Sequence, residues 1–275
     1  MIWPPFIPPR HPLPSDVTNA RAEFARINAS NGEILKPLIG AHLMGYDAAR
    51  TELLDAHRYI ADQTPLNLQA KTREAGLWLI AGRCIGLAHA AHLAVSAWFT
   101  IEVVPVLRSL HEATRLLSVF RNPGEEALIK RWLDGRSVSR GDVMAANRRQ
   151  EARAREQMLK HGRPIASPTS DYFERQYGRW SEFAHHRRRH MVDQVAVPDR
   201  VMAVGPHPDW RARAAAVDQF GWYVAELVSV GGFAMADLGR PEWIDRFQGT
   251  YRSLIELKNR IPLAEIAEGK GRQAP

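Results

Sequence analysis

The sequence has a single cysteine, Cys84, among its 275 residues, and this scarcity excludes two classes of protein. One cysteine cannot close an intramolecular disulfide, so the chain is not a disulfide scaffold. It also cannot supply the several thiolates that a zinc ribbon needs. Because nothing in the cysteine content calls for an oxidising compartment, we expect a cytoplasmic protein.

The sequence also lacks the loops that mark two common groups of enzymes. No segment reads GxxxxGK followed by Ser or Thr, so a phosphate-cradling P-loop is not expected. No Gly-x-Ser-x-Gly elbow is present, and Ser181 falls in the middle of a predicted helix, which is a poor place for an activated nucleophile. Both P-loop nucleotide hydrolysis and acyl transfer are therefore disfavoured.

Long hydrophobic runs are scarce as well. The longest stretch without acidic or basic residues is Cys84–Ile101, eighteen residues bounded closely by Arg83 and Glu102. It is at the lower limit of length for a bilayer span and contains His89 and His92. We therefore predict a buried core helix here and no association with a membrane.

Residues 1–14 contain six prolines. A secretory signal needs a continuous apolar run that is compatible with a helix, so this segment does not read as one. Proline fixes φ and removes an amide donor, which favours an extended polyproline II arm. We expect this arm to precede a single helical domain over 15–268 and a frayed tail over 269–275.

Apolar residues recur at three- and four-residue spacing along most of the chain, and no run of strict alternation predicts a strand. Asn31-Gly32 is expected to end the first helix, and Pro105 is expected to kink or restart a later one. The predicted fold class is an all-α helical bundle with at least six substantial helices. These are expected over 15–29, 33–63, 67–100, 105–120, 125–133, 142–160, 170–190, 209–238 and 242–267, with a possible break at Pro262.

Two polar residues interrupt an otherwise apolar helix face in the segment 104–120. Arg108 and Glu112 lie four residues apart, so they are one turn apart on the same face and can reach each other or a shared partner. The order, base before acid, is the weaker one for stabilising an isolated helix. The pair is a candidate site element; a surface ion pair, or a buried pair that sets helix register, is the alternative.

A second polar row runs along the predicted helix 170–190. Tyr177, Ser181 and His185 follow one another at four-residue spacing, which aligns a phenol, a hydroxyl and an imidazole along one stripe. Flanking aromatic residues suggest that part of the row is desolvated, where a histidine needs a partner, and Glu112 is a candidate. A structural network that joins two helices is the alternative.

The charge balance favours a polyanionic partner. The chain has 37 basic against 30 acidic residues, a net charge of +7, and only six of the basic residues are lysines. Arg187, Arg188 and Arg189 form a basic run next to the polar row and are candidates for binding phosphates. The arginine bias has an alternative explanation in a GC-rich genome. The basic run has an alternative explanation as a solvated helix end.

The Arg-x-Leu-His-Glu segment at 108–112 and the row of Tyr177, Ser181 and His185 resemble a bacterial all-helical family. That family looks related to the HEPN (higher eukaryote and prokaryote nucleotide-binding) superfamily, and the resemblance covers about 70–235. Many HEPN proteins are metal-independent ribonucleases with an Arg followed by His after four to six residues, a spacing that Arg179 and His185 meet. The chain departs from the usual pattern at Trp180, where active members commonly carry a polar residue.

The resemblance implies a homodimer that engages RNA or a nucleotide, and possible ribonuclease activity. His185 would then act on the ribose 2′-hydroxyl as general base or acid, while Arg179 or Arg108 stabilises the charge that develops on phosphorus. The alternative function is non-catalytic, with the Arg, Glu, Tyr, Ser and His residues forming a buried network that locks helices together or serves a binding partner.

Some histidine spacings also fit a metal site. His186 and His190 lie four residues apart, and the pair His89 and His92 is compatible with a site shared with His111 and Glu112. The Glu-x-x-His signature of helical di-iron bundles is absent. We therefore predict neither a metal nor a cofactor.

Overall fold

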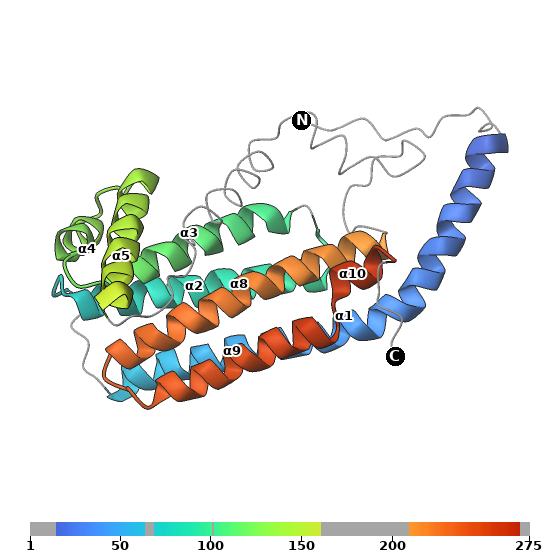
Figure 1. The fold of residues 1–275 in the computed structure, drawn as a ribbon. Helices are drawn as coiled ribbons and strands as arrows, with labels where there is room; N and C mark the ends of the chain where they lie inside the picture. Colours follow the sequence, from blue (N-terminus) through green and yellow to red (C-terminus); the bar gives the residue numbers. More distant parts are fainter. Residues whose placement is uncertain (1–14, 64–68, 101, 161–208, 270–275) are drawn as a thin grey trace.

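The computed structural model describes residues 15–63, 69–100, 102–160 and 209–269, and the regular structure in these ranges is entirely helical. The fold is an all-α bundle, as predicted, with at least six substantial helices (Figure 1). The helices are α1 (Ser15–Gln63), α2 (Arg73–Ser96), α3 (Val103–Arg121), α4 (Glu126–Leu133), α5 (Arg140–Lys160), α8 (Trp210–Asp237), α9 (Trp243–Arg260) and α10 (Leu263–Ala267).

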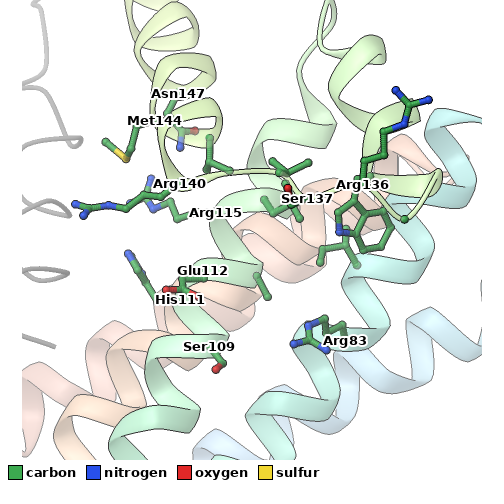
Figure 2. Close-up of a pocket in the computed structure, with 17 residues that line it drawn as sticks. Arg83, Ser109, His111, Glu112, Arg115, Arg136, Ser137, Arg140, Met144 and Asn147 are labelled. Carbon is green, nitrogen blue, oxygen red and sulfur yellow. The ribbon is translucent and has the colours of Figure 1, made fainter. Parts of the chain in front are cut away.

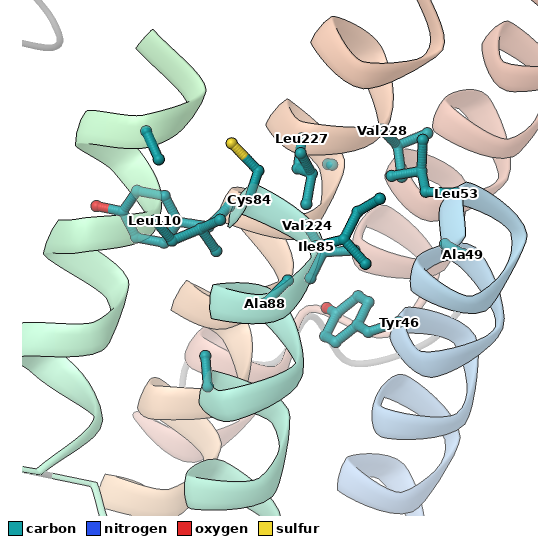
Figure 3. Close-up of a cluster of buried hydrophobic side chains, with 14 of the residues drawn as sticks. Tyr46, Ala49, Leu53, Cys84, Ile85, Ala88, Leu110, Val224, Leu227 and Val228 are labelled. Carbon is teal, nitrogen blue, oxygen red and sulfur yellow. The ribbon is translucent and has the colours of Figure 1, made fainter. Parts of the chain in front are cut away.

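Helices α2 and α8 form the centre of the bundle. Helix α2 packs against α1, α3, α4 and α8, and α8 packs against α1, α2, α3, α9 and α10. Helices α4 and α5 lie together at one end of α3, as Figure 1 shows. The core between α1, α2, α3 and α8 is made of close-packed side chains (Figure 3): Tyr46, Ala49, Leu53, Cys84, Ile85, Ala88, Leu110, Val224, Leu227 and Val228.

Helix α1 runs without interruption from residue 15 to residue 63, so the predicted stop at Asn31-Gly32 is wrong. Gly32 is buried, and a Cβ at this position would overlap the indole of Trp210. The backbone N–H of Trp210 also donates a hydrogen bond to Asn28 Oδ1 at 3.0 Å. The glycine therefore allows the start of α8 to approach α1, and packing outweighs its tendency to end a helix.

The other helix boundaries follow from local signals. Thr72 caps α2, because its hydroxyl accepts a hydrogen bond from the Ala75 N–H at 3.2 Å. The predicted helix 67–100 was too long, since α2 covers only 73–96. Pro105 lies in the first turn of α3, which confirms the predicted restart, and Pro262 separates α9 from α10.

The turn after α2 contains a residue in an unusual conformation. Trp98 has φ of 66°, which is costly for a bulky side chain. Its ring meets that of Trp210 edge to face at 5.4 Å, and the Arg213 guanidinium lies 4.8 Å from the Trp98 ring. These contacts stabilise the strained turn and tie it to the start of α8.

Helix α2 is long and apolar enough to cross a membrane by length and composition. It supplies Cys84, Ile85 and Ala88 to the core and is packed against four other helices, as expected for the core helix that the apolar run predicts. The run itself extends past Ser96 into the turn before α3, so it does not form one continuous helix.

Candidate functional site

One face of α3 carries four charged or titratable side chains. Arg108, His111, Glu112 and Arg115 follow at three- and four-residue spacing and therefore share this face. The predicted pair forms, with Arg108 Nε 3.0 Å from Glu112 Oε1. Because 48% of the Glu112 side chain is exposed, the pair is a surface ion pair and not a buried one.

The other two residues of this face meet a carboxylate from α8. Glu226 Oε2 lies 3.4 Å from His111 Nδ1, and Glu226 Oε1 lies 3.4 Å from Arg115 Nε. The His111 ring is buried and packs edge to face against Tyr223, with 5.7 Å between ring centroids. Burial lowers the pKa of Arg115, and the negative charge of Glu226 opposes this shift. Glu226 thus joins α3 to α8.

This face of α3 borders a cleft with a volume of about 690 Å³. Its walls come from α2, α3, α5, the end of α4 and the connection from α4 to α5, and Figure 2 shows the lining side chains. We call it the arginine cleft, because four of the lining residues are arginines: Arg83, Arg115, Arg136 and Arg140. Among the residues that the structure describes, Glu112 is the single acidic residue in the lining.

The connection that carries Arg136 is anchored by local interactions at the start of α5. The Asp142 N–H donates to Ser139 Oγ at 3.2 Å, and Asp142 Oδ2 accepts from the Ser139 N–H at 2.9 Å. This reciprocal pair is a capping box, which satisfies backbone groups at the helix start. Gly135, with φ of 73°, makes the turn after α4. The connection therefore places Arg136 at the cleft, and the start of α5 places Arg140 there.

The cleft combines positive charge with apolar walls. Guanidinium groups bind phosphate and carboxylate groups through planar, often paired hydrogen bonds. The apolar lining includes Ile80, Leu116 and Trp132, which offer surface to a hydrophobic or aromatic group. The volume lies within the range of small-molecule sites, roughly 300 to 1,000 Å³. The arrangement suits an anionic ligand that also carries an apolar or ring-shaped part.

Two of the predicted site residues lie at the cleft. Glu112 lines it, and Arg108 pairs with Glu112 beside it. The other predicted site residues fall outside the residues that the structure describes, so the contact between Glu112 and His185 stays a prediction. They are Tyr177, Arg179, Ser181, His185, Arg187, Arg188 and Arg189.

Sequence reasoning missed several residues that line the cleft or lie next to its lining. His111 was considered only as a metal ligand, although it shares a helix face with Arg108 and Arg115. Glu226 is the only charged residue within the apolar segment 220–235, and this isolation was an available signal. The connection 134–139, together with Arg140 at the start of α5, supplies two arginines and two serines beside a glycine, a polar composition that also marks a binding loop.

The described residues do not bring together three or more of the side chains that commonly bind metals. His92 lies 3.9 Å from Asp47, and His111 lies against Glu226, so these histidines contact different carboxylates. His186 and His190 lie outside the described ranges.

Comparison with known proteins gave no match: no family model, no curated protein and no solved structure is significantly similar to the chain. The functional assignment therefore rests on the geometry and chemistry of the arginine cleft.

Proposed function

We propose that the arginine cleft binds the phosphate groups of RNA or of a nucleotide. One observation carries this proposal: within the described part of the chain, four arginines and one carboxylate line a cavity of about 690 Å³. Glu226 lies 3.4 Å from Arg115 and Asp134 lies 3.9 Å from Arg136, so these carboxylates offset part of the positive charge, while the described lining still holds more arginine than acidic side chains. Such a concentration of one sign of charge attracts anions.

The shape of the cleft supports a nucleotide unit over a simple anion. A nucleotide combines a phosphate with a flat, largely apolar base, and the lining offers both arginines and the apolar side chains of Trp132 and Leu116. The sequence resemblance to the HEPN superfamily implies the same class of ligand. We also propose that the protein cleaves RNA without a metal, and that it does so as a homodimer inside the cell.

A second candidate function is non-catalytic, and one observation favours it. Glu226 connects α8 to both His111 and Arg115 of α3, which is the geometry of a network that locks two helices. In that case the polar residues serve stability, and the protein acts through a binding partner.

RNA binding tests the leading proposal directly. We would measure fluorescence anisotropy of a labelled single-stranded RNA of mixed sequence with the wild-type protein and with Arg136→Ala/Arg140→Ala. The matched control is Arg252→Ala/Arg260→Ala, which removes the same charge from α9, a helix that does not line the cleft. We expect the cleft variant to bind about tenfold more weakly or worse, while the control stays near wild type.

The salt dependence gives a second readout. Each phosphate contact that is lost should reduce the slope of log K against log salt by about 0.7 for single-stranded RNA. Equal affinity and equal slope for the two double variants would contradict a role of the cleft in binding RNA. The same titrations with a labelled nucleotide show whether the cleft binds a nucleotide or RNA more tightly.

A further inference from the structure

We propose that His111, oriented by Glu226, is the general base of the arginine cleft and removes the proton from a ribose 2′-hydroxyl of bound RNA. This inference rests on the proposed function, specifically on RNA as the ligand. It assigns the proton transfer to a residue of α3 that lines the cleft. It differs from the expectation that His185 performs this step.

The contact with Glu226 determines which ring nitrogen takes the proton. Glu226 Oε2 lies 3.4 Å from His111 Nδ1, and a carboxylate accepts a hydrogen bond, so Nδ1 carries the hydrogen. The neutral ring then has its lone pair on Nε2, which is the basic nitrogen. A carboxylate hydrogen-bonded to an imidazole selects the tautomer and stabilises the imidazolium that forms during catalysis, as in the Ser-His-Asp triad.

The surroundings hold the ring in one orientation. The ring of Tyr223 packs against His111, and His111 is only 4% exposed, so its rotation is restricted. Arg115 contacts the second oxygen of Glu226, which fixes the carboxylate as well. A catalytic base must be held close to its productive geometry, and these contacts provide that support.

Glu112 is the other possible base in the lining. Its carboxylate is about half exposed and is already engaged in an ion pair with Arg108 at 3.0 Å. An imidazole is better matched to proton transfer near neutral pH. His111 is therefore the stronger candidate among the described residues of the cleft.

The proposed step balances in atoms and charge. The 2′-hydroxyl gives its proton to His111 Nε2, and the 2′-oxygen forms a bond to the adjacent phosphorus while the bond from phosphorus to the 5′-oxygen breaks. The departing 5′-oxygen takes a proton from water, and the imidazolium returns its proton to the solvent. The products are a 2′,3′-cyclic phosphate and a 5′-hydroxyl. The arginines that line the cleft would stabilise the charge that develops on the phosphorane.

The test uses variants that keep the structural contacts. In His111→Asn the side-chain amide can still donate to Glu226, but it cannot accept a proton. His89→Asn is the matched control, because His89 is exposed on α2 and does not line the cleft. We would measure single-turnover cleavage of end-labelled RNA, with protein in excess of the dissociation constant found by anisotropy.

We expect His111→Asn to cleave about 100-fold more slowly or worse, with RNA affinity within about twofold of wild type. His89→Asn should behave as wild type. Glu226→Gln keeps an acceptor for Nδ1–H but removes the charge, so it should shift the pH–rate profile as well as lower the rate. A purely structural role of Glu226 would not shift the pH–rate profile. The Glu226→Gln variant therefore tests the inference even if His111→Asn does not fold.

Other outcomes overturn the inference in distinguishable ways. Wild-type protein that binds RNA through the cleft arginines but leaves it intact would refute the catalytic step and retain the proposed function. Full activity in His111→Asn with loss in His185→Asn would assign the base to His185. If RNA binding does not depend on the cleft arginines, the proposed function is refuted, and this inference is refuted with it.

Discussion

The phenol ring of Tyr46 in α1 lies directly against Gly221 of α8, at the centre of the bundle. Tyr46 is fully buried, and its ring meets Phe220 edge to face with 5.8 Å between centroids. A Cβ built on Gly221 would overlap both the hydroxyl oxygen and the ring of Tyr46. The absence of a side chain at position 221 is therefore what allows α1 and α8 to pack this closely.

Gly221→Ala should destabilise the protein, because the added methyl group overlaps a buried ring. We expect a loss of about 1 to 3 kcal/mol in the free energy of unfolding, measured by denaturant titration. Gly249→Ala is the control, since a Cβ at this exposed position of α9 meets nothing within 4 Å. There the better helix propensity of alanine should raise stability by up to about 1 kcal/mol. Equal effects of the two substitutions would contradict the close approach.

The two glutamates near His111 should differ in their effect on stability. Glu226→Leu removes the carboxylate that lies 3.4 Å from the largely buried Arg115 and should cost about 3 kcal/mol. Glu112→Gln removes only a half-exposed pair with Arg108 and should cost about 0.5 kcal/mol or less. Thermal midpoints of both variants under identical conditions check this difference. A small effect of Glu226→Leu would show that the link between α3 and α8 is not structural.

Stability should fall as the pH drops below about 6.5, the ordinary pKa of histidine. Burial lowers the pKa values of His42 and His57 in the folded protein. His42 also faces Lys258, which lowers its pKa further, while Asp218 and the carbonyl of Leu38 oppose the shift. The unfolded chain then binds protons that the folded protein excludes, so protonation favours unfolding.

Thermal midpoints between pH 8 and pH 5 measure this effect. His42→Asn keeps a donor for the Leu38 carbonyl and removes the titrating group, so its midpoint should depend less on pH in this range. A variant with the wild-type pH dependence would exclude His42 as a source of the effect.

The thiol of Cys84 should be inert in the folded protein. Burial raises its pKa to about 12, and the side chain lies within the core. Thiol reagents act on the thiolate, so modification at pH 8 should require unfolding. The rate of modification, followed by mass spectrometry against denaturant concentration, should track global unfolding. Rapid modification without denaturant would contradict the placement of Cys84 in the core.

Helix boundaries were predictable where the signal is local. The proline restart at position 105 and the break at Pro262 follow from the backbone chemistry of proline. The predicted stop at Asn31-Gly32 failed, because the packing of Trp210 on Gly32 comes from a residue far along the chain. Local propensity is a weak term that such long-range contacts override.

The candidate site was predictable only in part. The spacing of Arg108 and Glu112 correctly placed them on one helix face, and the contact between them follows from that spacing. The contacts of Glu226 with His111 and Arg115 span more than a hundred residues of sequence, so no spacing rule reveals them. The same applies to the cleft, which needs α2, α3 and α5 side by side.

The sequence by itself determined the all-α class of the bundle, because helical periodicity and helix stop signals act between residues that are neighbours in the chain. It also determined the excess of arginine that makes an anionic partner plausible. The tertiary structure alone decided which arginines surround a cavity, and that the partly buried carboxylate of Glu226 lies against His111. These relationships depend on how helices pack, and packing is settled by the whole set of long-range contacts.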